Sequence, residues 1–256
     1  MIFVSYSHAD KEWRQRFETI AKPMSRAIDI EFWSDKNLKA GKWDTQLEEA
    51  MKKAEAAVFL VSPAFLASDY IIDKELSYFI KAHKDRGLMI FWFYLEPCDI
   101  KWHPEIREFQ AMTLGDLKPL SSLTNWEWQE TMVRGCGMID EFVKTLEQPV
   151  INPAVKNASL QKRTKDFPLL AKPARRDVEV LVYSGDKKWW RQGIVKAGNS
   201  TTTIQLGNDH TAPGTSFKVI ALTTERPLTE DSYLNIPLHR TKTDEITLIR
   251  ASGLKA

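Results

Sequence analysis

Glu75 is the residue of this chain whose surroundings most clearly suggest chemistry. It lies in the run SDYIIDKELSYFI at residues 68–80, where helical spacing places it in one row with Ile71 and Phe79. A carboxylate in such an apolar row is costly to bury unpaired. Either a hydrogen-bonding partner satisfies it, or a pocket opens in front of it and the carboxylate serves a reaction. Periodicity alone leaves both readings open.

The first 147 residues alternate short apolar runs with longer amphipathic ones, a pattern typical of βα units around a parallel sheet. The expected strands cover residues 2–6, 28–33, 57–62 and 88–95. The expected helices cover residues 11–21, 43–55, 70–84 and 124–146. We therefore expect an α/β fold with a flavodoxin-like, doubly wound parallel sheet. In such a fold, ligands bind beyond the carboxyl ends of the strands.

The remaining residues differ from the first 147 in composition and periodicity. Residues 148–176 carry scattered prolines and basic side chains, which predicts a linker. Beyond it, β-branched and aromatic runs are separated by glycine-containing turns. The strands expected there cover residues 177–183, 189–196, 201–206, 216–223 and 245–250. We expect three parts: an α/β domain over 1–147, a linker over 148–176 and a small immunoglobulin-like β-sandwich over 177–256.

Composition limits the classes of function. A net charge of +2 favours neither nucleic acid nor an anionic membrane as the main partner, and no apolar run reaches the roughly 20 residues of a membrane span. Cys98 and Cys136 are too few for a disulfide framework and have no metal-ligand spacing, so no metal is expected. The chain begins without a basic segment followed by an apolar core. These features predict a cytoplasmic protein.

Six blocks in the first 147 residues carry a family resemblance. They read IFVSYSHAD at 2–10, FWSDKNLKAGKW at 32–43, VFLVSPAFLASDY at 58–70, KEL at 74–76, EFQAM at 108–112 and KPL at 118–120. In this order they resemble the strands, loops and catalytic-glutamate helix of the Toll/interleukin-1 receptor (TIR) family, with the last two blocks closest to bacterial members.

The resemblance implies an NAD⁺ nucleosidase in which Glu75 is the catalytic carboxylate and NAD⁺ is a substrate, with no other cofactor. Cleavage of the nicotinamide–ribose bond leaves an oxocarbenium-like ribosyl cation, which a nearby carboxylate stabilises. Attack by water gives ADP-ribose, and attack by the adenine of the same molecule gives a cyclic ADP-ribose. The sequence leaves the choice of product open.

Several residues near the expected strand ends are candidates for substrate contact, although each also has an ordinary packing or capping role. They are Ser5, Tyr6, Ser7, Trp33, Asp35, Trp43, Tyr70 and Ile71. In many family members an aromatic residue lies four positions before the glutamate. Here that position is Ile71, and the aromatic residue is Tyr70, about 140° round an α-helix from Glu75.

Two further readings concern partners. A non-enzymatic TIR adaptor would act through homotypic TIR–TIR contacts at the loop over residues 35–42, and the same contacts would assemble an enzyme into a homo-oligomer. The β domain is a candidate site for a protein or ligand that triggers assembly, as in a bacterial immune effector active against phage. Specific nucleic-acid binding by the basic residues of 156–176 is not expected, because no aromatic side chains are interleaved with them.

Overall fold

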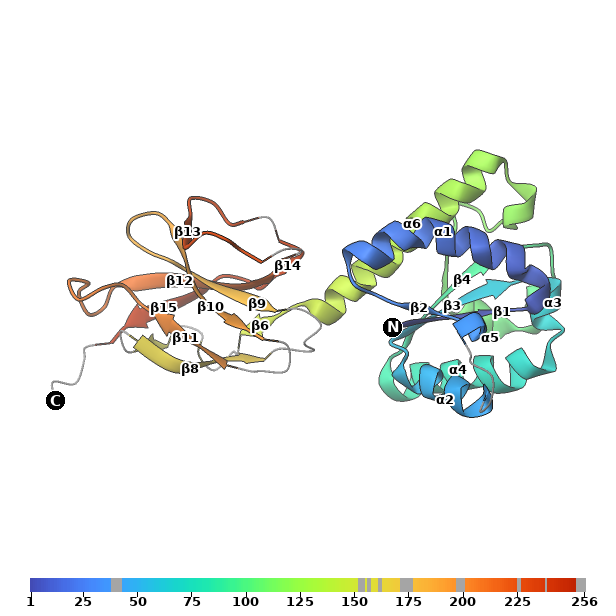
Figure 1. Cartoon of the computed structure of the whole chain (residues 1–256), viewed down its shortest axis with the longest axis horizontal. Coiled ribbons are helices and arrows are strands. Elements are labelled where there is room, and N and C mark those ends of the chain that lie inside the picture. Colours follow the sequence, from blue (N-terminus) through green and yellow to red (C-terminus); the bar gives the residue numbers. More distant parts are fainter. Residues whose placement is uncertain are drawn as a thin grey trace. The chain divides into compact units, whose positions relative to one another are not determined.

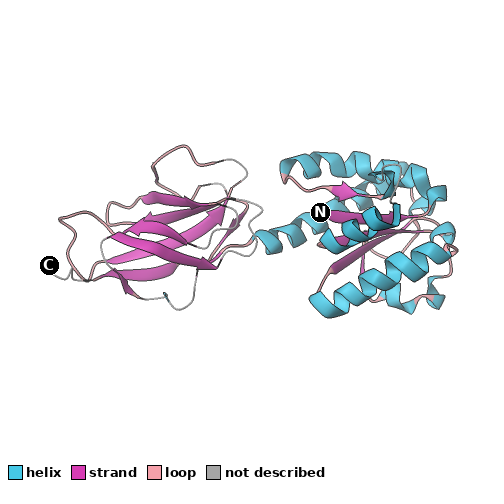
Figure 2. Cartoon of the chain, turned by 60° about the horizontal axis from the view of Figure 1, so that its bottom comes forward, coloured by secondary structure: helices cyan, strands magenta, loops and turns pink. Residues whose placement is uncertain are grey.

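Figure 1 shows the chain as a computed structural model, which describes residues 1–37, 43–151, 155, 158–160, 163–170, 177–196, 201–224, 227–237 and 239–251. The chain divides into two compact units, Met1–Asp140 and Glu141–Ala256. Helices belong mainly to the first unit, whereas the second consists of strands and loops after the last turns of one helix (Figure 2).

The first unit is built on a parallel sheet with the strand order β2-β1-β3-β4-β5. Its strands are β1 (Ile2–Tyr6), β2 (Phe32–Trp33), β3 (Ala56–Val61), β4 (Met89–Tyr94) and β5 (Gln110–Ala111). All residues of β1 and β3 are buried. In register, Val4 lies opposite Val58, and Phe59 lies opposite Trp92. The predicted α/β architecture with a parallel sheet is therefore confirmed for this unit.

Helices cover both faces of this sheet (Figure 1). They are α1 (Lys11–Ala27), α2 (Trp43–Lys53), α3 (Pro63–Leu66), η3 (Ile71–Leu76), α4 (Ser77–Arg86), α5 (Pro104–Arg107) and α6 (Asn125–Glu147), with short 3-10 turns η1 (His8–Asp10), η2 (Asp35–Asn37), η4 (Ile100–Trp102) and η5 (Leu120–Ser122). Leu47 of α2 and Phe79 of α4 pack in one core with Phe59. On the other face, Phe17 of α1 contacts Phe93 at 5.6 Å between ring centroids.

The second strand and the helix before it differ from the prediction. Helix α1 continues past Pro23 to Ala27, and the N–H of Ile28 still donates to Met24 at 3.0 Å. The strand expected over residues 28–33 is confined to Phe32–Trp33. Asp29 has φ 51°, which interrupts the extended backbone. The apolar residues before β2 are buried, but in a turn, so apolar character alone gave the wrong conformation.

The helix that carries Glu75 is interrupted by a π-helical segment. From Ile71 to Leu76 its hydrogen bonds follow the wider π register, and the N–H of Ser77 donates to the carbonyl of Ile72 five residues earlier. Periodicity predicted an uninterrupted α-helix over residues 70–84, which is wrong for this turn. Because a π turn contains more residues than an α turn, it changes which side chains share a face.

Helix α6 begins with a capping box and packs closely on the sheet. Glu127 accepts hydrogen bonds from the backbone and hydroxyl of Thr124 at 2.9 and 2.7 Å. Farther along, a Cβ added at Gly135 would lie 2.5 Å from Phe93 Cζ, whereas one at Gly137 would meet nothing within 4 Å. Only a residue without a side chain allows this approach to Phe93.

We expect Gly135→Ala to lower the free energy of unfolding by about 1–3 kcal/mol, because the added methyl overpacks the core beside Phe93. Gly137→Ala is the matched control on the same helix. It is expected to raise stability by about 0.5–1 kcal/mol, because alanine favours a helix more than glycine does. Chemical denaturation of both variants measures the difference, and equal effects of the two substitutions would contradict this packing.

The second unit contains two sheets. The larger has the order β13-β10-β9-β12-β15-β7, with β14 also paired to β12, and the smaller has the order β11-β8-β6. The strands are β6 (Val150–Ile151), β7 (Ser159–Leu160), β8 (Arg163–Leu170), β9 (Val178–Tyr183), β10 (Trp189–Val195), β11 (Thr201–Gln205), β12 (Ser216–Thr223), β13 (Ser232–Tyr233), β14 (Thr241–Lys242) and β15 (Ile246–Arg250). Phe167 and Ile204 of the smaller sheet share a core with Val180 and Val219 of the larger.

The described residues between 148 and 176 form strands, whereas the prolines of this segment predicted an irregular linker. They contribute β6, β7 and β8, and β8 pairs antiparallel with β11, with Pro168 opposite Thr201. The register between these two strands shifts between Thr202 and Ile204. Proline has no N–H to donate to a strand ladder, and Pro168 lies one pair away from this irregularity. The basic residues Lys156, Lys162, Lys172, Arg175 and Arg176 lie outside the described part of the chain.

A buried ion pair joins the last residue of α6 to the strands of the second unit. Arg240 Nε donates to Glu147 Oε2 at 2.6 Å, and both side chains are almost fully buried. The hydroxyl of Thr241 also donates to the backbone carbonyl of Glu147 at 3.4 Å. The end of this long helix is thus part of the second unit's interior.

Candidate active site

Glu75 lies next to Ser5 at the carboxyl end of β1. Its side chain comes from the π-helical segment, and the Ser5 hydroxyl donates to Glu75 Oε2 at 2.5 Å. Both residues are buried, with 7% of Glu75 and 1% of Ser5 exposed. The carboxylate that sequence periodicity placed in an apolar row therefore has a hydrogen-bonding partner that lies 70 positions away in the sequence.

Burial changes the acidity of Glu75. Removal from water raises the pKa of the carboxyl group, the Ser5 hydrogen bond lowers it, and the negative charge of Asp35 raises it, so that together they bring the pKa to about 7. The group therefore changes its charge near neutral pH. Carboxyl groups tuned in this way by burial and a neighbouring charge are typical of active sites, although structural networks also produce them.

Asp35 belongs to η2, directly after β2, and faces the same region. Its Oδ2 atom lies 3.2 Å from Nε2 of His8, whose side chain is exposed. Within the described residues, Asp35 Oδ1 is buried without a hydrogen-bond partner, and so is the hydroxyl oxygen of its neighbour Ser34. The end of β2 thus presents two buried oxygen atoms that have unused hydrogen-bonding capacity.

Tyr6, the last residue of β1, lies beside Asp35. Burial, with a hydrogen bond to Asp35 and repulsion from its charge, raises the pKa of the Tyr6 phenol, so it stays protonated at neutral pH. The Arg14 guanidinium lies over the ring, 5.2 Å from its centroid. Arg14 is itself held by Glu18 at 2.6 Å. Contacts with Asp35 and with Arg14 therefore hold the Tyr6 side chain in place.

The other candidates are placed in different ways. Ile71 is buried in the core, and Trp33 is half-buried with its ring 5.1 Å from that of Phe3, so both have packing roles. Ser7 accepts a hydrogen bond from the N–H of Ala9 at 3.4 Å and caps the turn after β1. The side chain of Trp43 lies outside the described part of the structure, as do residues 38–42 of the expected contact loop.

The π-helical segment alters the position of Tyr70 relative to Glu75. In an α-helix, residues five apart are separated by about 140°, but hydrogen bonds from i to i+5 bring them about one turn apart. Burial raises the pKa of Tyr70 to about 12, and the charge of Glu75 is the next largest cause. Tyr70 and Glu75 therefore lie close enough to interact.

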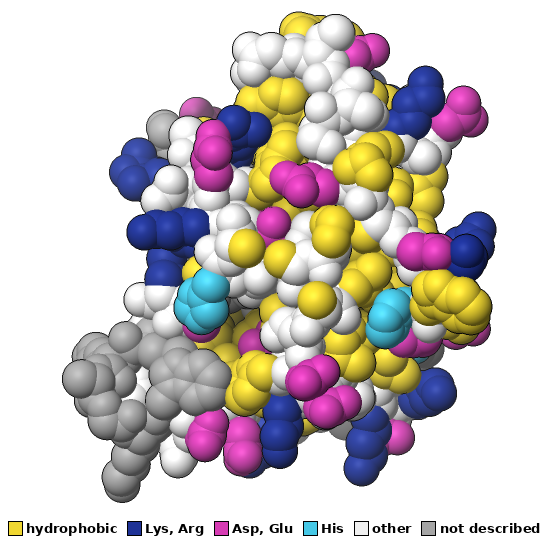
Figure 3. All heavy atoms as spheres, turned by 90° about the vertical axis from the view of Figure 1, so that its right-hand side faces the viewer, with side chains coloured by type: hydrophobic (Ala, Val, Ile, Leu, Met, Phe, Trp, Pro, Cys, Tyr) yellow, Lys and Arg dark blue, Asp and Glu magenta, His cyan; other side chains and the backbone are white. Residues whose placement is uncertain are grey.

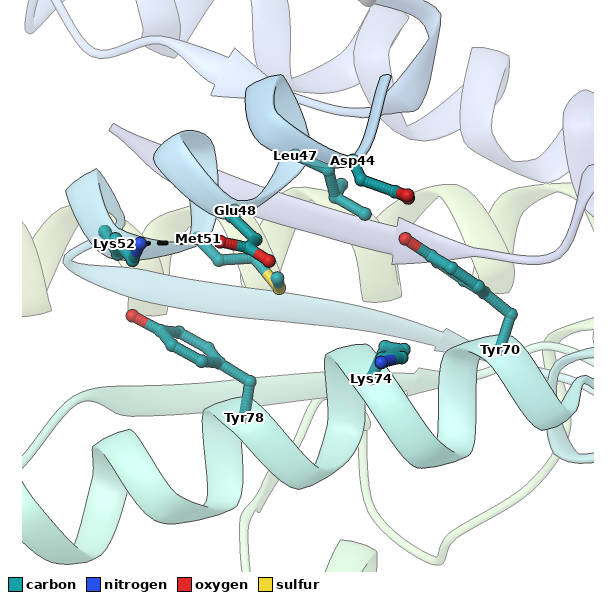
Figure 4. A pocket seen from close by; sticks show the side chains of 8 residues that line it. All are labelled: Asp44, Leu47, Glu48, Met51, Lys52, Tyr70, Lys74 and Tyr78. Carbon is teal, nitrogen blue, oxygen red and sulfur yellow. Dashed lines mark hydrogen bonds and ion pairs between the residues drawn. The ribbon is translucent and has the colours of Figure 1, made fainter. Parts of the chain in front are cut away.

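Tyr70 also lines a pocket of about 410 Å³ between α2 and the η3–α4 helix (Figure 4). Its lining residues are Asp44, Leu47, Glu48, Met51, Lys52, Tyr70, Lys74 and Tyr78. The Tyr70 hydroxyl points toward Asp44, and Leu47 and Met51 give the pocket an apolar wall. Glu75 is not a lining residue, so Tyr70 is the side chain common to the pocket and the surroundings of Glu75.

Except for Tyr70, the pocket residues were missed in the sequence. A signal for them exists, because Asp44, Glu48 and Lys52 follow i, i+4, i+8 spacing on one helix, as Tyr70, Lys74 and Tyr78 do along the next. Such rows are ordinary on solvated helix faces. Only the packing of the two helices shows that these rows face one another.

A second buried carboxylate, also overlooked in the sequence, lies at the same edge of the sheet. Asp10 accepts a hydrogen bond from the Ser62 hydroxyl at 2.6 Å, and Ser62 also accepts the N–H of Phe65 at the start of α3. Burial raises the pKa of Asp10, Ser62 lowers it, and Glu96 raises it. This arrangement connects the first turn of the chain to β3 and has an evident structural role.

The surface around the strand ends is mixed in character. Figure 3 shows acidic and hydrophobic side chains interleaved over the middle of this face, with most basic side chains near its margins. Among the described residues, no three side chains of the metal-ligating types lie together. None of the described helices is long and apolar enough to cross a bilayer.

The family model described as "TIR domain" matches residues 2–130 of this chain. Among curated proteins, the uncharacterized protein y4lF of Sinorhizobium fredii (strain NBRC 101917 / NGR234) is 31% identical over 103 residues. These residues make up 40% of this chain and 31% of that protein, so the chain spans about a third of this relative's length.

Two solved structures also resemble the chain. The TIR domain of the Toll-related receptor TRR-2 from Hydra magnipapillata is 17% identical with a TM-score of 0.33, over 43% of this chain and 82% of that one. The TIR domains of the activated Roq1 resistosome, which directly recognises the pathogen effector XopQ, are 14% identical with a TM-score of 0.32. That alignment covers 54% of this chain and 83% of the other.

Proposed function

This chain belongs to the TIR-domain family, and from that premise we propose that it is an NAD⁺ nucleosidase that cleaves the nicotinamide–ribose bond. Glu75 is the catalytic carboxylate of this proposal. The observation that carries it is a buried carboxylate with a pKa of about 7 at the carboxyl ends of parallel strands, where doubly wound sheets bind ligands.

The chemistry needs little more than this carboxylate. Nicotinamide leaves as a neutral molecule and takes the electron pair of the glycosidic bond, so it needs no proton. Ionised Glu75 stabilises the positive charge that develops on the ribosyl carbon, and a low-dielectric site strengthens this interaction. Water then adds and loses a proton, giving ADP-ribose, or the adenine of the same molecule attacks and gives a cyclic ADP-ribose.

The neighbouring groups fit parts of this substrate. If substrate binding opens this region, the unpartnered, buried Asp35 Oδ1 and Ser34 hydroxyl oxygens would accept hydrogen bonds from ribose hydroxyl groups. The pocket beside Tyr70 has a volume typical of small-molecule sites and two tyrosine side chains. Tyr70 takes the aromatic role that other family members give to the position of Ile71, because the π-helical register brings it toward Glu75.

A non-enzymatic TIR adaptor is the second candidate function. The observation in its favour is that Glu75 is only 7% exposed and already bonded to Ser5, as expected of a structural carboxylate. In that case the chain would act through homotypic contacts between TIR domains. The elevated pKa favours the enzyme, because a structural carboxylate gains nothing from an environment that disfavours its charged form.

We further propose that activity depends on assembly into a homo-oligomer through TIR–TIR contacts in the cytoplasm, as in a bacterial immune effector active against phage. The β-rich second unit is the proposed site at which a protein or ligand triggers this assembly. Its immunoglobulin-like character and the flavodoxin-like character of the first unit stay predictions.

We expect nicotinamide release from NAD⁺ to increase between about pH 5 and pH 9, with a midpoint near the pKa of Glu75, because the ionised carboxylate is the active form. Burial raises that pKa to about 7. The measurement uses purified full-length chain at high concentration with a crowding agent, and chromatography separates the linear and cyclic products. No nicotinamide release at any of these pH values would support the adaptor.

Two substitutions are expected to move this midpoint in opposite directions. Ser5→Ala removes a hydrogen bond that lowers the Glu75 pKa, so the midpoint should rise, whereas Asp35→Asn removes a charge that raises it, so the midpoint should fall. Shifts in the same direction, or a midpoint that neither substitution moves, would show that another group controls the pH dependence.

A further inference from the structure

The second unit contains a pocket of about 670 Å³ that the proposed reaction does not use. It lies among the turn between β9 and β10, the end of β11 and the loop before β12. Its lining residues include Val182, Asp186, Trp190, Gln205, Asn208 and Phe217. All of them belong to the second unit.

The floor of this pocket is the end of the core between the two sheets. Val182 and Phe217 are buried in the same core as Phe167 of the smaller sheet. Trp190 supplies a half-exposed aromatic wall, with 38% of its surface accessible, whereas its neighbour Trp189 is buried on the opposite face of the large sheet. The pocket therefore combines an apolar floor with a flat ring.

The position of the Trp190 ring is fixed by the adjacent turn. Its Nε1 donates to Asp186 Oδ2 at 2.8 Å, and Asp186 also accepts the Ser184 hydroxyl and the N–H of Lys188. The Ser184 hydrogen bond is the main cause that lowers the pKa of Asp186, and Trp190 adds to it. The indole is thus preorganised, and an ionised carboxylate lies at the pocket edge.

The polar side chains of the pocket retain unused amide groups. Asn208 Oδ1 accepts from the N–H of His210 and the hydroxyl of Thr211, and Gln205 Nε2 donates to the carbonyl of Gly207. Within the described residues, Asn208 Nδ2 and Gln205 Oε1 take part in no hydrogen bond. One amide donor and one amide acceptor therefore remain for a ligand.

The charges of the pocket argue against an anionic ligand. Of the described residues that line it, only Arg191 is cationic, and it is held by Glu179 through hydrogen bonds of 2.7 and 3.0 Å. Among the described lining residues, a phosphate group would meet the Asp186 carboxylate and no cationic side chain other than the paired Arg191. We propose that this pocket binds an uncharged ring compound bearing hydroxyl or amide groups, a class that includes nucleosides and N-acetylated sugars, with one ring face stacked on Trp190.

Ligand-observed NMR and calorimetric titration of the full-length chain test this proposal with adenosine and N-acetylglucosamine as separate probes. Saturable binding of either probe supports the proposed ligand class and shows whether the bound ring is that of a nucleoside or of a sugar. We expect AMP to bind about tenfold more weakly than adenosine, because it adds only a charged phosphate to the same ring. Equal affinity for AMP, or no saturable binding of either uncharged probe, would overturn the proposal.

Trp190→Ala is expected to weaken binding about tenfold or more, because it removes the stacking surface. Trp190→Phe keeps an aromatic ring at this half-exposed position and should therefore retain part of the affinity. Its remaining binding would show that the second unit is folded. Trp102→Ala is the matched control, since Trp102 is 74% exposed in the first unit and lines no part of this pocket. Loss of binding in Trp102→Ala, or full binding in Trp190→Ala, would place the ligand elsewhere.

Discussion

We expect the Glu75→Gln variant to lose NAD⁺ cleavage by about 10²- to 10³-fold in kcat, the range seen when one transition-state-stabilising group is removed. The amide still accepts the Ser5 hydroxyl but carries no charge to stabilise the ribosyl cation. Asp73→Asn is the matched control, because Asp73 is exposed on the same π-helical segment and loses the same charge. We expect this control to keep its activity.

The same variant separates a catalytic carboxylate from a structural one by its stability. Glu75 has a pKa of about 7 in the folded protein against an ordinary value of 4.5, so the folded state binds the proton more tightly. Stability is therefore lost as pH rises from about 4.5 to 7, by about 3 kcal/mol at most. Glu75→Gln should be more stable than the parent at pH 8 and equal to it at pH 4. A variant destabilised at pH 8 would indicate a structural carboxylate.

The second large effect concerns the buried ion pair of the second unit. We expect Arg240→Met to lower the free energy of unfolding by about 3–5 kcal/mol, because it removes the guanidinium that pairs with the buried Glu147 carboxylate. Both side chains are nearly inaccessible, with 3% and 1% exposure. Urea denaturation of the full-length chain, followed by circular dichroism, measures this loss.

An exposed ion pair in the same unit provides the control. Lys218 lies 3.0 Å from Glu245, with side-chain exposures of 55% and 38%. Because solvent screens such a pair, we expect Lys218→Met to change stability by less than about 1 kcal/mol. Similar losses in both variants would show that the burial of Arg240 and Glu147 does not control the stability of this region.

Hydrophobic patterning was enough to predict the parallel-sheet architecture of the first unit, because strands buried on both faces have unbroken apolar runs and helices have a regular apolar row. Residues 2–6 form β1 as predicted, and the helix predicted over 124–146 spans Asn125–Glu147. The same periodicity identified Glu75 as a carboxylate in a buried row. These features depend on neighbours within a few residues, so they can be predicted without knowledge of the tertiary structure.

The tertiary structure alone decided how these parts meet. The contact between Ser5 and Glu75 spans 70 positions, and the pocket beside Tyr70 requires two helices to face each other. The π-helical register of residues 71–76 depends on which carbonyl each N–H selects, and the side-chain pattern does not encode that choice. Strand β8 likewise forms despite Pro168 because β11 pairs with it. Hydrophobic periodicity reports which face is buried, whereas hydrogen-bond register and long-range pairing are settled only when distant segments pack together.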